Sequence, residues 1–365
     1  MKRILMFGYL PPPMFGPSAS YQALMRSEFA RHFDVTFINL SVVKSIDELE
    51  VFRAGKLLKF AGFAWRELGC LLRRRYDGCC YPVSLSKNAF LKDALLLKLA
   101  RMFGVPTVIY AHGTGFAAFR ETLSPRLRRW FDAMIQKSAG AIVMAEALRS
   151  DFDGWLPAER VFVVRHGIEP AELPARERRR TLTILSLGLL RREKGIFDLL
   201  EAMPLVLARR PDVKLVVAGQ WWRPDQQAAA EIFVREQKLA GAVEFIGPVA
   251  GAAKTRCLGA ADIFVFSSHT KSEAFGMVLL EAMQAGLPVV TTRGGAREEI
   301  IDGGVNGLLA NEQDPADLAV KILQLAGDAA LREQMGRANR ERFAREFTHE
   351  HYGRRMIDAL EAMLR

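Results

Sequence analysis

The chain has 365 residues, of which 50% are hydrophobic and 25% charged, with 29 glycines and 16 prolines. This composition excludes a disordered chain, a collagen-like repeat and a disulfide scaffold, and the length favours two domains. The formal net charge is +10, and all of it lies in residues 1–165, which hold 24 Lys and Arg against 14 Asp and Glu. Such a basic half suits an anionic membrane, a diphosphate-bearing substrate or a nucleic acid, and the plain alternative is a solvated basic surface.

Short β-branched runs alternate with helical patterns in the first half, which is typical of parallel α/β units. An apolar run follows Lys2 and Arg3, but Gly8 interrupts it and no small-residue cleavage site follows, so we expect a strand and not a signal peptide. The predicted strands are residues 4–9, 35–39, 107–111, 141–145 and 161–164. The predicted helices are residues 19–32, 53–76, 89–103 and 124–137.

The second half repeats this alternation after residues 169–180, a charged, proline-bearing stretch without strand or helix periodicity. The predicted strands are residues 183–187, 214–218, 243–246, 263–266 and 288–291, and the predicted helices lie near 196–209, 226–239, 276–285 and 296–301. The sequence therefore predicts an α/β protein with two doubly wound domains, residues 1–168 and 169–348, that face each other across a cleft. Ligands of such sheets bind outside the carboxyl ends of the strands.

Two carboxylates stand eight residues apart in the segment 272–283. Glu273 lies in a loop, and Glu281 lies in a helix predicted to begin near Gly276, so both can address one polyol ligand. The backbone N–H groups of Phe275–Val278 and the helix dipole form an anion site at the helix start. A diphosphate flanked by hydroxyl-bearing groups has the chemical shape of a nucleotide sugar. Two isolated glutamates would instead be a helix-terminal charge and a solvated face residue.

Other candidate residues follow predicted strands. Arg192 and Lys194 lie between a strand and a helix, where cations suit a pyrophosphate leaving group, although an ordinary basic turn would look the same. Gly16 lies in the proline-rich loop 9–20, where a glycine lets the backbone approach a ligand closely. His112 follows the strand 107–111, and a lone histidine of this kind is more often structural than functional.

The stretch from Glu273 to Leu308, about 35 nearly continuous residues, resembles the signature of the retaining family-4 glycosyltransferases of GT-B fold, the glycosyl transferases group 1. The resemblance implies that Glu281 binds the ribose hydroxyls of a nucleotide and that Glu273 lies beside the donor sugar. It also implies that three backbone amides face the sugar hydroxyls and the diphosphate: those of Phe275, Gly276 and Met277.

The same resemblance extends to the other candidates. Lys194 matches a diphosphate-binding lysine of the family, whereas Leu189 stands where the family has an arginine, a role that Arg192 is proposed to take over. It implies that the Gly16 loop closes over the donor phosphate and acceptor, and that His112 is the active-site histidine near the sugar. The turn at His166 matches the family only in its glycine and the aliphatic residue that follows, so His166 is not assigned a catalytic role. The last helix, about 349–365, is expected to cross back onto the first domain.

Residues 53–76 form a predicted basic amphipathic helix with a tryptophan, which suits a membrane interface as well as a core helix with a solvated basic face. The four cysteines lack metal-ligand spacing and are expected to be buried thiols. No Asp-x-Asp pattern occurs, and neither a metal nor another cofactor is expected.

The sequence as a whole predicts a retaining, metal-independent glycosyltransferase that uses a nucleotide-diphosphate sugar. The expected acceptor is a lipid-linked saccharide of bacterial surface polysaccharide or lipopolysaccharide synthesis, with a cytoplasmic location and peripheral contact at the inner membrane face. The alternatives are a sugar-nucleotide epimerase of the same fold and a basic nucleic-acid-binding module, for which no recognition motif is present.

Overall fold

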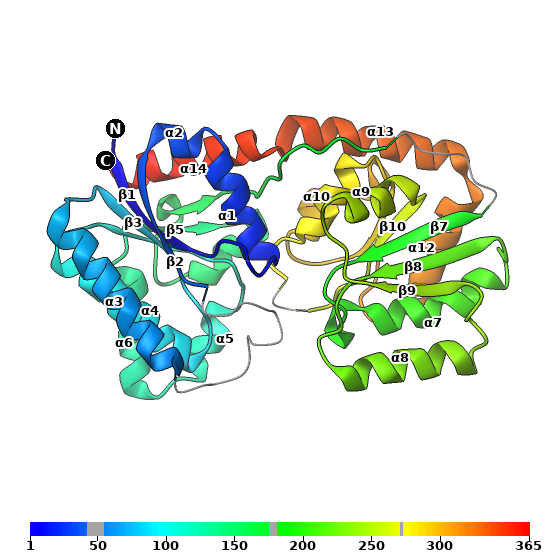
Figure 1. Cartoon of the computed structure of the whole chain (residues 1–365), viewed down its shortest axis with the longest axis horizontal. Helices are drawn as coiled ribbons and strands as arrows, with labels where there is room; N and C mark the ends of the chain where they lie inside the picture. The colour runs from blue at the N-terminus through cyan, green and yellow to red at the C-terminus, as the bar shows by residue number, and fades with distance from the viewer. Residues whose placement is uncertain (42–54, 175–180, 271–272) are drawn as a thin grey trace. The chain divides into compact units, whose positions relative to one another are not determined.

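The computed structural model describes residues 1–41, 55–174, 181–270 and 273–365, with the side chains of residues 55–59 and 88 outside the description. The chain divides into two compact units, Met1–Glu169 with Thr348–Arg365, and Pro170–Phe347. Each unit contains one six-stranded sheet, and every strand pairing in both sheets is parallel (Figure 1).

The sheet of the first unit has the strand order β2-β1-β3-β4-β5-β6, so the order reverses between β1 and β3. The strands are β1 (Arg3–Gly8), β2 (Asp34–Asn39), β3 (Gly78–Pro82), β4 (Thr107–Tyr110), β5 (Gly140–Val143) and β6 (Val161–Val163). The helices are α1 (Gly16–Arg26), α2 (Phe29–His32), α3 (Gly55–Arg73), α4 (Lys87–Met102), α5 (Phe116–Glu121), α6 (Pro125–Gln136) and the carboxyl-terminal α14 (His349–Met363), with 3-10 turns η2 (Glu146–Phe152) and η3 (Ala158–Arg160).

One face of this first sheet is covered by α1, α2 and α14, which share a core of fully buried aromatic and aliphatic side chains with β1, β4 and β5. The opposite side carries α3, α4 and α6 (Figure 1). Helix α14 follows the whole second unit in sequence, yet Tyr352, Met356 and Leu360 have no exposed surface in the first unit's core. The last helix is therefore an integral part of the first unit.

The structure differs from the sequence prediction at one helix and one strand of this unit, and α5 was not predicted either. The single helix expected over residues 19–32 is two helices, because Ser27 adopts an extended conformation and its hydroxyl donates to the carbonyl of Leu24 (2.7 Å). The same hydroxyl accepts the N–H of Phe29 (3.2 Å), which starts α2. Strand β3 was not predicted, because Gly78–Pro82 is buried throughout and has neither β-branched residues nor alternation.

The second sheet has the order β12-β11-β10-β7-β8-β9, so its reversal lies between β7 and β10. The strands are β7 (Leu182–Leu187), β8 (Val213–Ala218), β9 (Val243–Gly247), β10 (Ile263–Phe266), β11 (Val289–Thr292) and β12 (Gly307–Ala310). The helices are η4 (Arg192–Lys194), α7 (Ile196–Leu207), α8 (Pro224–Glu236), α9 (Gly251–Ala260), α10 (Met277–Gln284), α11 (Arg297–Ile300), α12 (Pro315–Gly327) and α13 (Ala329–Glu346).

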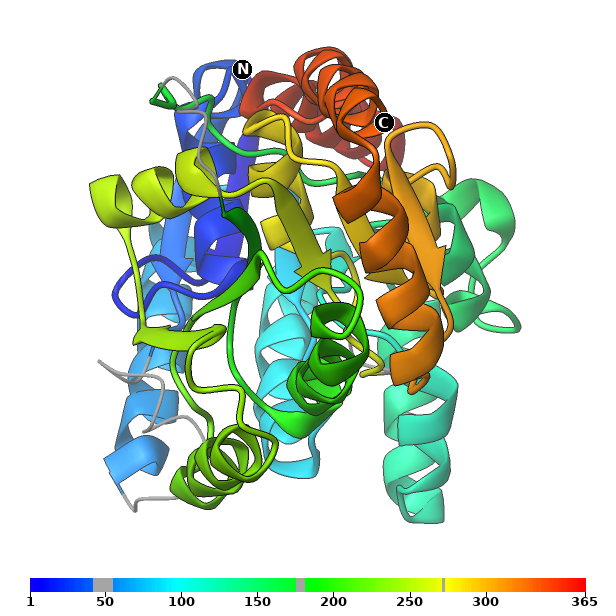
Figure 2. The ribbon, with the colours of Figure 1, turned by 90° about the vertical axis from the view of Figure 1, so that its right-hand side faces the viewer.

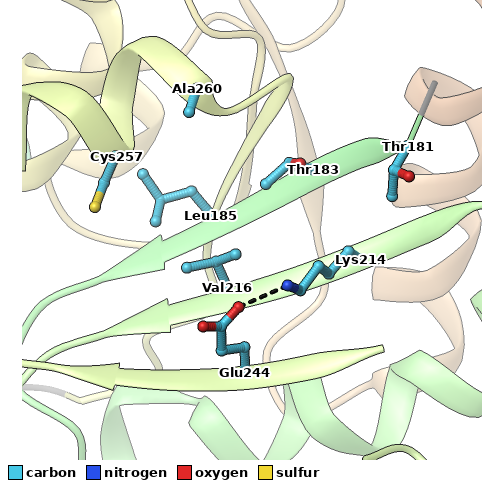
Figure 3. Close-up of a pocket in the computed structure, with 8 residues that line it drawn as sticks. All are labelled: Thr181, Thr183, Leu185, Lys214, Val216, Glu244, Cys257 and Ala260. Atoms are coloured by element: carbon cyan, nitrogen blue, oxygen red, sulfur yellow. Dashed lines mark ion pairs between the residues drawn. The ribbon is translucent and has the colours of Figure 1, made fainter. Parts of the chain in front are cut away.

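Helices α7 and α12 lie side by side (Figure 2). Together with α8 and the strands, they form the hydrophobic core of the second unit. The other face carries α9 and α10 (Figure 1). Helix α9 was not predicted, because its Gly- and Ala-rich sequence buries only Leu258 and shows no apolar period. It leaves part of the face uncovered, as a pocket of about 360 Å³ that is lined by Thr181, Thr183, Leu185, Lys214, Val216, Glu244, Cys257 and Ala260 (Figure 3).

The cysteines are free, but only two of them fit the expectation of buried thiols. Cys79 and Cys80 are buried in β3, whereas Cys70 and Cys257 are half-buried. Three predictions fall partly outside the described residues: the start of the helix 53–76, the end of the seam 169–180, and Ser272 of the segment 272–283.

Candidate active site

The candidate donor site lies where the strand order of the second sheet reverses. Lys194 follows β7 and Glu273 follows β10, and these two strands are parallel neighbours. Their carboxyl ends therefore meet at one edge of the sheet. In open α/β sheets, this reversal point is where ligands bind.

The loop that carries Lys194 is fixed to the end of β10. Gly195 has a left-handed conformation (φ +73°), and a Cβ at this position would lie 1.8 Å from the carbonyl oxygen of Ser267, so only glycine fits. The hydroxyl of Ser267 donates to the carbonyl of Gly195 (2.7 Å), and the N–H of His269 donates to that of Glu193 (3.1 Å). The His269 ring also lies 3.1 Å from the Asp198 carboxylate at the start of α7. These contacts hold Lys194 at the edge of the sheet.

Lys194 and Glu273 form a direct ion pair through Nζ and Oε2. Their side chains are 26% and 13% exposed, so water screens this pair less than it screens a surface pair. The sequence separates the two residues by 79 positions, and the fold brings them together. The Lys194 ammonium and the Glu273 carboxylate are thus in contact at the carboxyl edge of the sheet.

A buried arginine, Arg297, lies near this pair. The side chain of Arg297 is 4% exposed and pairs with Glu312 (2.6 Å), while its Nε donates to the carbonyl of Thr292 (3.0 Å). Burial lowers the pKa of Arg297, and the charges of Glu312 and Glu273 partly offset this effect. Arg297 therefore adds positive potential near Glu273 and fixes the glycine turn that follows β11.

Glu281 lies inside α10, whose first residue follows Gly276 in a left-handed conformation (φ +84°). Its Oε1 accepts from Nζ of Lys254 on α9 (2.7 Å), and its Oε2 is buried without a hydrogen-bond partner among the described residues. Of the residues at the helix start, Phe275 is buried, whereas Met277 and Val278 are half-buried. Glu281 and the start of α10 thus lie on the segment that directly follows Glu273.

Arg192 lies in the same loop as Lys194, but its interactions differ. Its guanidinium lies 4.0 Å from the ring centroid of Phe197, and its backbone N–H donates to Gln226 (3.0 Å). The residue is exposed, whereas Lys194 is half-buried. In this structure Arg192 is held by a cation–π contact, and it is not part of the ion pair at Glu273.

The remaining candidates, Gly16 and His112, lie in the first unit, after β1 and β4 respectively. His112 is half-buried, packs against Tyr110 (centroids 4.1 Å apart) and Tyr21 (5.1 Å), and its Nε2 is buried without a partner among the described residues. Burial lowers the pKa of His112 to about 3, so the ring is neutral at physiological pH. Gly16 is exposed at the start of α1, and a Cβ there would meet nothing within 4 Å.

His166 is buried in a hydrogen-bonded cluster. Its Nε2 lies 2.9 Å from the hydroxyl of Tyr110, which is 2.5 Å from the hydroxyl of Tyr352 on α14. Burial and the neighbouring His112 hold the pKa of His166 well below its usual value. This cluster ties α14 to β4, which accounts for a structural role of His166.

The basic helix α3 buries Phe63, Glu67 and Leu71, one turn apart. Trp65 on the same helix is 74% exposed, and it lies beside the exposed Arg66. Leu72 and Arg73 repeat this arrangement two turns later. The outer face of α3 therefore mixes cations with large apolar side chains, unlike an ordinary solvated basic face.

Residues 172–342 match the family model described as "Glycosyl transferases group 1". This match lies within the second unit, which is therefore similar to the glycosyl transferases group 1 family. Glycogen synthase of Mycobacterium tuberculosis (strain ATCC 25618 / H37Rv) is 29% identical over 264 residues, which are 69% of this chain and 62% of that protein. Phosphatidyl-myo-inositol mannosyltransferase of Mycolicibacterium smegmatis is 35% identical over 141 residues, which are 38% of this chain and 34% of that protein. The matched regions thus span less than two thirds of these relatives.

Among solved structures, HepE of Anabaena in complex with UDP-glucose is similar over 99% of this chain and 100% of that chain, with 18% identity and a TM-score of 0.76. Together with the two parallel sheets, this likeness confirms the GT-B fold class predicted from the sequence. The resemblance to the glycosyl transferases group 1 that residues 273–308 indicate is confirmed by the family-model match.

Sequence reasoning missed Lys254 and Arg297, which contact or neighbour the two predicted glutamates. Arg297 follows Gly294, Gly295 and Ala296 inside the segment that resembles the family signature, so the sequence did carry a signal for this residue. No signal in the sequence indicated Lys254, because it lies in helix α9, which was not predicted. No three His, Cys, Asp or Glu side chains within the described ranges form a group that could hold a metal ion, and none of the described helices is long and apolar enough to span a membrane.

Proposed function

We propose that this protein transfers a sugar from a nucleotide-diphosphate sugar to a hydroxyl acceptor with retention of the anomeric configuration. The observation that supports this most is the placement of Lys194, Glu273 and Glu281 at the strand reversal of the second sheet. A cation for the diphosphate, a carboxylate for the sugar and a carboxylate for the ribose match the three parts of such a donor.

In the proposed reaction, the bond between the anomeric carbon and the diphosphate oxygen breaks, and its electron pair leaves with the diphosphate. The acceptor hydroxyl oxygen bonds to the same face of that carbon, and its proton passes to the departing phosphate oxygen. Negative charge grows on the diphosphate, where Lys194 and the backbone N–H groups at the start of α10 stabilise it. Arg192 joins them if its side chain leaves Phe197 when the donor binds. Glu273 stabilises the cationic sugar, and neutral His112 donates a hydrogen bond to it.

This proposal needs no metal ion or other cofactor, because fixed cations and a helix start carry the charge of the diphosphate. The sugar and the base of the donor are identified by binding. A thermal-shift panel of UDP, GDP, ADP and their sugars should show one nucleotide that raises the unfolding temperature, because a ligand that binds the native state stabilises it. If no member of the panel shifts the temperature, the proposed donor class is wrong.

Retention is tested on the product. With an α-configured donor, nuclear magnetic resonance of the purified glycoside should show an α-linkage, and a β-linkage would refute the proposed same-face attack. Conversion of the donor to another nucleotide sugar in the absence of any acceptor would support an epimerase instead.

We further propose that the acceptor is a lipid-linked saccharide of surface polysaccharide or lipopolysaccharide synthesis, presented at the cytoplasmic face of a membrane. The outer face of α3 supports this, because Trp65 and Leu72 (69% exposed) alternate with arginines. Apolar side chains insert at an interface, while each cation near an anionic lipid surface contributes about 1 kcal/mol, screened over roughly 8 Å at physiological salt.

Sedimentation with anionic liposomes tests this surface. The wild-type protein should sediment at low salt and be released as the salt concentration rises. Binding should be lost on replacing five basic residues in α3 or directly after it by Gln: Lys59, Arg66, Arg73, Arg74 and Arg75. A matched control carries the same number of exposed substitutions in the second unit: Arg223, Arg235, Lys238, Arg337 and Arg345. An equal loss of liposome binding in both variants would indicate that binding depends only on the net charge of the protein. A wild-type protein that does not sediment with the liposomes would refute membrane contact.

A further inference from the structure

Lys254 occupies one oxygen of the Glu281 carboxylate and leaves the other one open. Its Nζ lies 2.7 Å from Oε1 of Glu281, whereas Oε2 is buried and has no hydrogen-bond partner among the described residues. The side chains are 30% and 18% exposed, so the pair is sheltered from solvent. A buried carboxylate oxygen without a donor is costly, so a ligand hydroxyl that donates to it would stabilise it.

We propose that Lys254 is a positioning residue that orients Glu281 toward the ribose of the donor and thereby sets the preference for a ribonucleotide. This inference rests on the proposed function, because the ribose role of Glu281 belongs to it. Lys254 acts through Glu281, and its own contact with the nucleotide is not required.

The backbone of both residues is held by regular structure. Lys254 lies in the first turn of α9 (Gly251–Ala260), and Glu281 lies within α10 (Met277–Gln284). A free glutamate side chain loses rotamer entropy when it binds a ligand. Because the ion pair with Lys254 already restricts the Glu281 side chain, ligand binding costs less entropy. Anchoring at Oε1 thus directs Oε2 to accept hydrogen bonds from ribose hydroxyls.

The charge balance fits a neutral polyol. The pair has no net charge, so a ribose can bind at Oε2 of Glu281 without leaving an uncompensated carboxylate buried. Without Lys254, the carboxylate would be free to turn toward solvent or toward another cation. Ribose affinity would then fall, while contacts to the base and the diphosphate would remain.

The experiment compares two ligands by titration calorimetry: the ribonucleoside diphosphate that the thermal-shift panel selects, and its 2′,3′-dideoxy analogue. In the wild type we expect the analogue to bind roughly 10- to 100-fold more weakly, since it lacks the hydroxyls that donate to a charged acceptor. In Lys254→Met we expect about tenfold weaker binding of the ribonucleotide and unchanged binding of the analogue. Lys254→Arg should retain the wild-type preference, because it keeps the charge.

Two further variants make the result specific. Lys214→Met removes a lysine from a similar ion pair on the same unit, with Glu244 at 2.6 Å (Figure 3), and should leave both affinities unchanged. Lys254→Met combined with Glu281→Gln should bind the ribonucleotide no more weakly than Glu281→Gln alone, because Lys254 acts only through that carboxylate.

The outcomes separate this inference from the function on which it rests. If Lys254→Met weakens both ligands equally or neither, Lys254 does not set ribose preference and the inference is overturned, while the donor site stands. If the wild-type protein binds the nucleotide but does not distinguish the analogue, the ribose role of Glu281 fails, and the inference fails with it. If no nucleoside diphosphate binds at all, the proposed function itself is refuted.

Discussion

Replacing Lys194 by Ala tests how the cation at the sheet edge contributes to catalysis. The change removes one partner of the Lys194–Glu273 pair, whose side chains are 26% and 13% exposed. A pair at this depth lies between a fully buried one, which costs about 3–5 kcal/mol to break, and a surface pair worth about 0–1 kcal/mol. We therefore expect the free energy of unfolding to fall by about 1–3 kcal/mol.

The catalytic effect has a different origin. Charge on the diphosphate grows toward the transition state, so the loss of a fixed cation should lower kcat roughly 100- to 1,000-fold. The donor KM should rise by less, because the ground state already spreads its charge over the diphosphate and the surrounding water. Steady-state kinetics over a range of donor concentrations measures both constants. The matched control is Lys214→Ala, whose ion pair with Glu244 is more exposed (40% and 50%) and lies away from the strand reversal.

The double variant Lys194→Ala with Glu273→Gln separates stability from catalysis. It leaves no uncompensated carboxylate, so its unfolding free energy should return toward that of the wild type, while kcat stays low. Recovery of kcat in the double variant would mean that Lys194 only neutralises Glu273. Equal losses in kcat/KM and in donor affinity for Lys194→Ala would mean that it binds ground state and transition state alike. Either result would refute the reasoning.

Three further predictions concern titration and metal dependence. Burial raises the pKa of Glu67 from 4.5 to about 8, so the native state binds a proton that the unfolded chain releases, and stability should fall as the pH rises from about 4.5 to 8. Glu67→Gln should match the wild type near pH 4.5 and unfold at a higher temperature near pH 8, and parallel curves would contradict this. Because the pKa of His112 is about 3, kcat should show no imidazole step between pH 5 and 9, and a step near pH 6 that disappears in His112→Gln would show otherwise. Transfer should persist in excess EDTA, and complete loss that Mg²⁺ or Mn²⁺ restores would exclude the metal-free mechanism.

The amino-acid sequence was sufficient to predict five of the six strands in each sheet and the segment that resembles the family signature. Most strands of the second unit were predicted to within one or two residues, because their β-branched cores and intervening helices alternate with a clear period. The strands β3 and β12 and the helices α5, α9, α12 and α13 were not predicted. At β3 and α9 the reason is that cysteine, glycine and alanine carry no period. The family signature was visible because its glycines, glutamates and apolar residues are consecutive in the chain.

The orientation of the candidate side chains was not available from the sequence. The amphipathic pattern of α3 does not by itself show which side chains are packed, and the structure buries Phe63, Glu67 and Leu71. Trp65 on the same helix is exposed. Which face a helix buries depends on the sheet and on α4, and neither is encoded within the helix itself. Arg192 is a similar case, because only packing shows that its guanidinium lies over Phe197.

The sequence by itself determined the order of most elements, the strand ends that carry Lys194 and Glu273, and the residue types available there. These follow from local rules, since a strand and a helix start each depend on a few neighbouring residues. Only the tertiary structure decided that Lys254 holds Glu281 and that Arg297 lies buried behind Glu273. Those pairings depend on how separate helices and loops pack on one sheet, and hence on contacts between residues far apart in the chain.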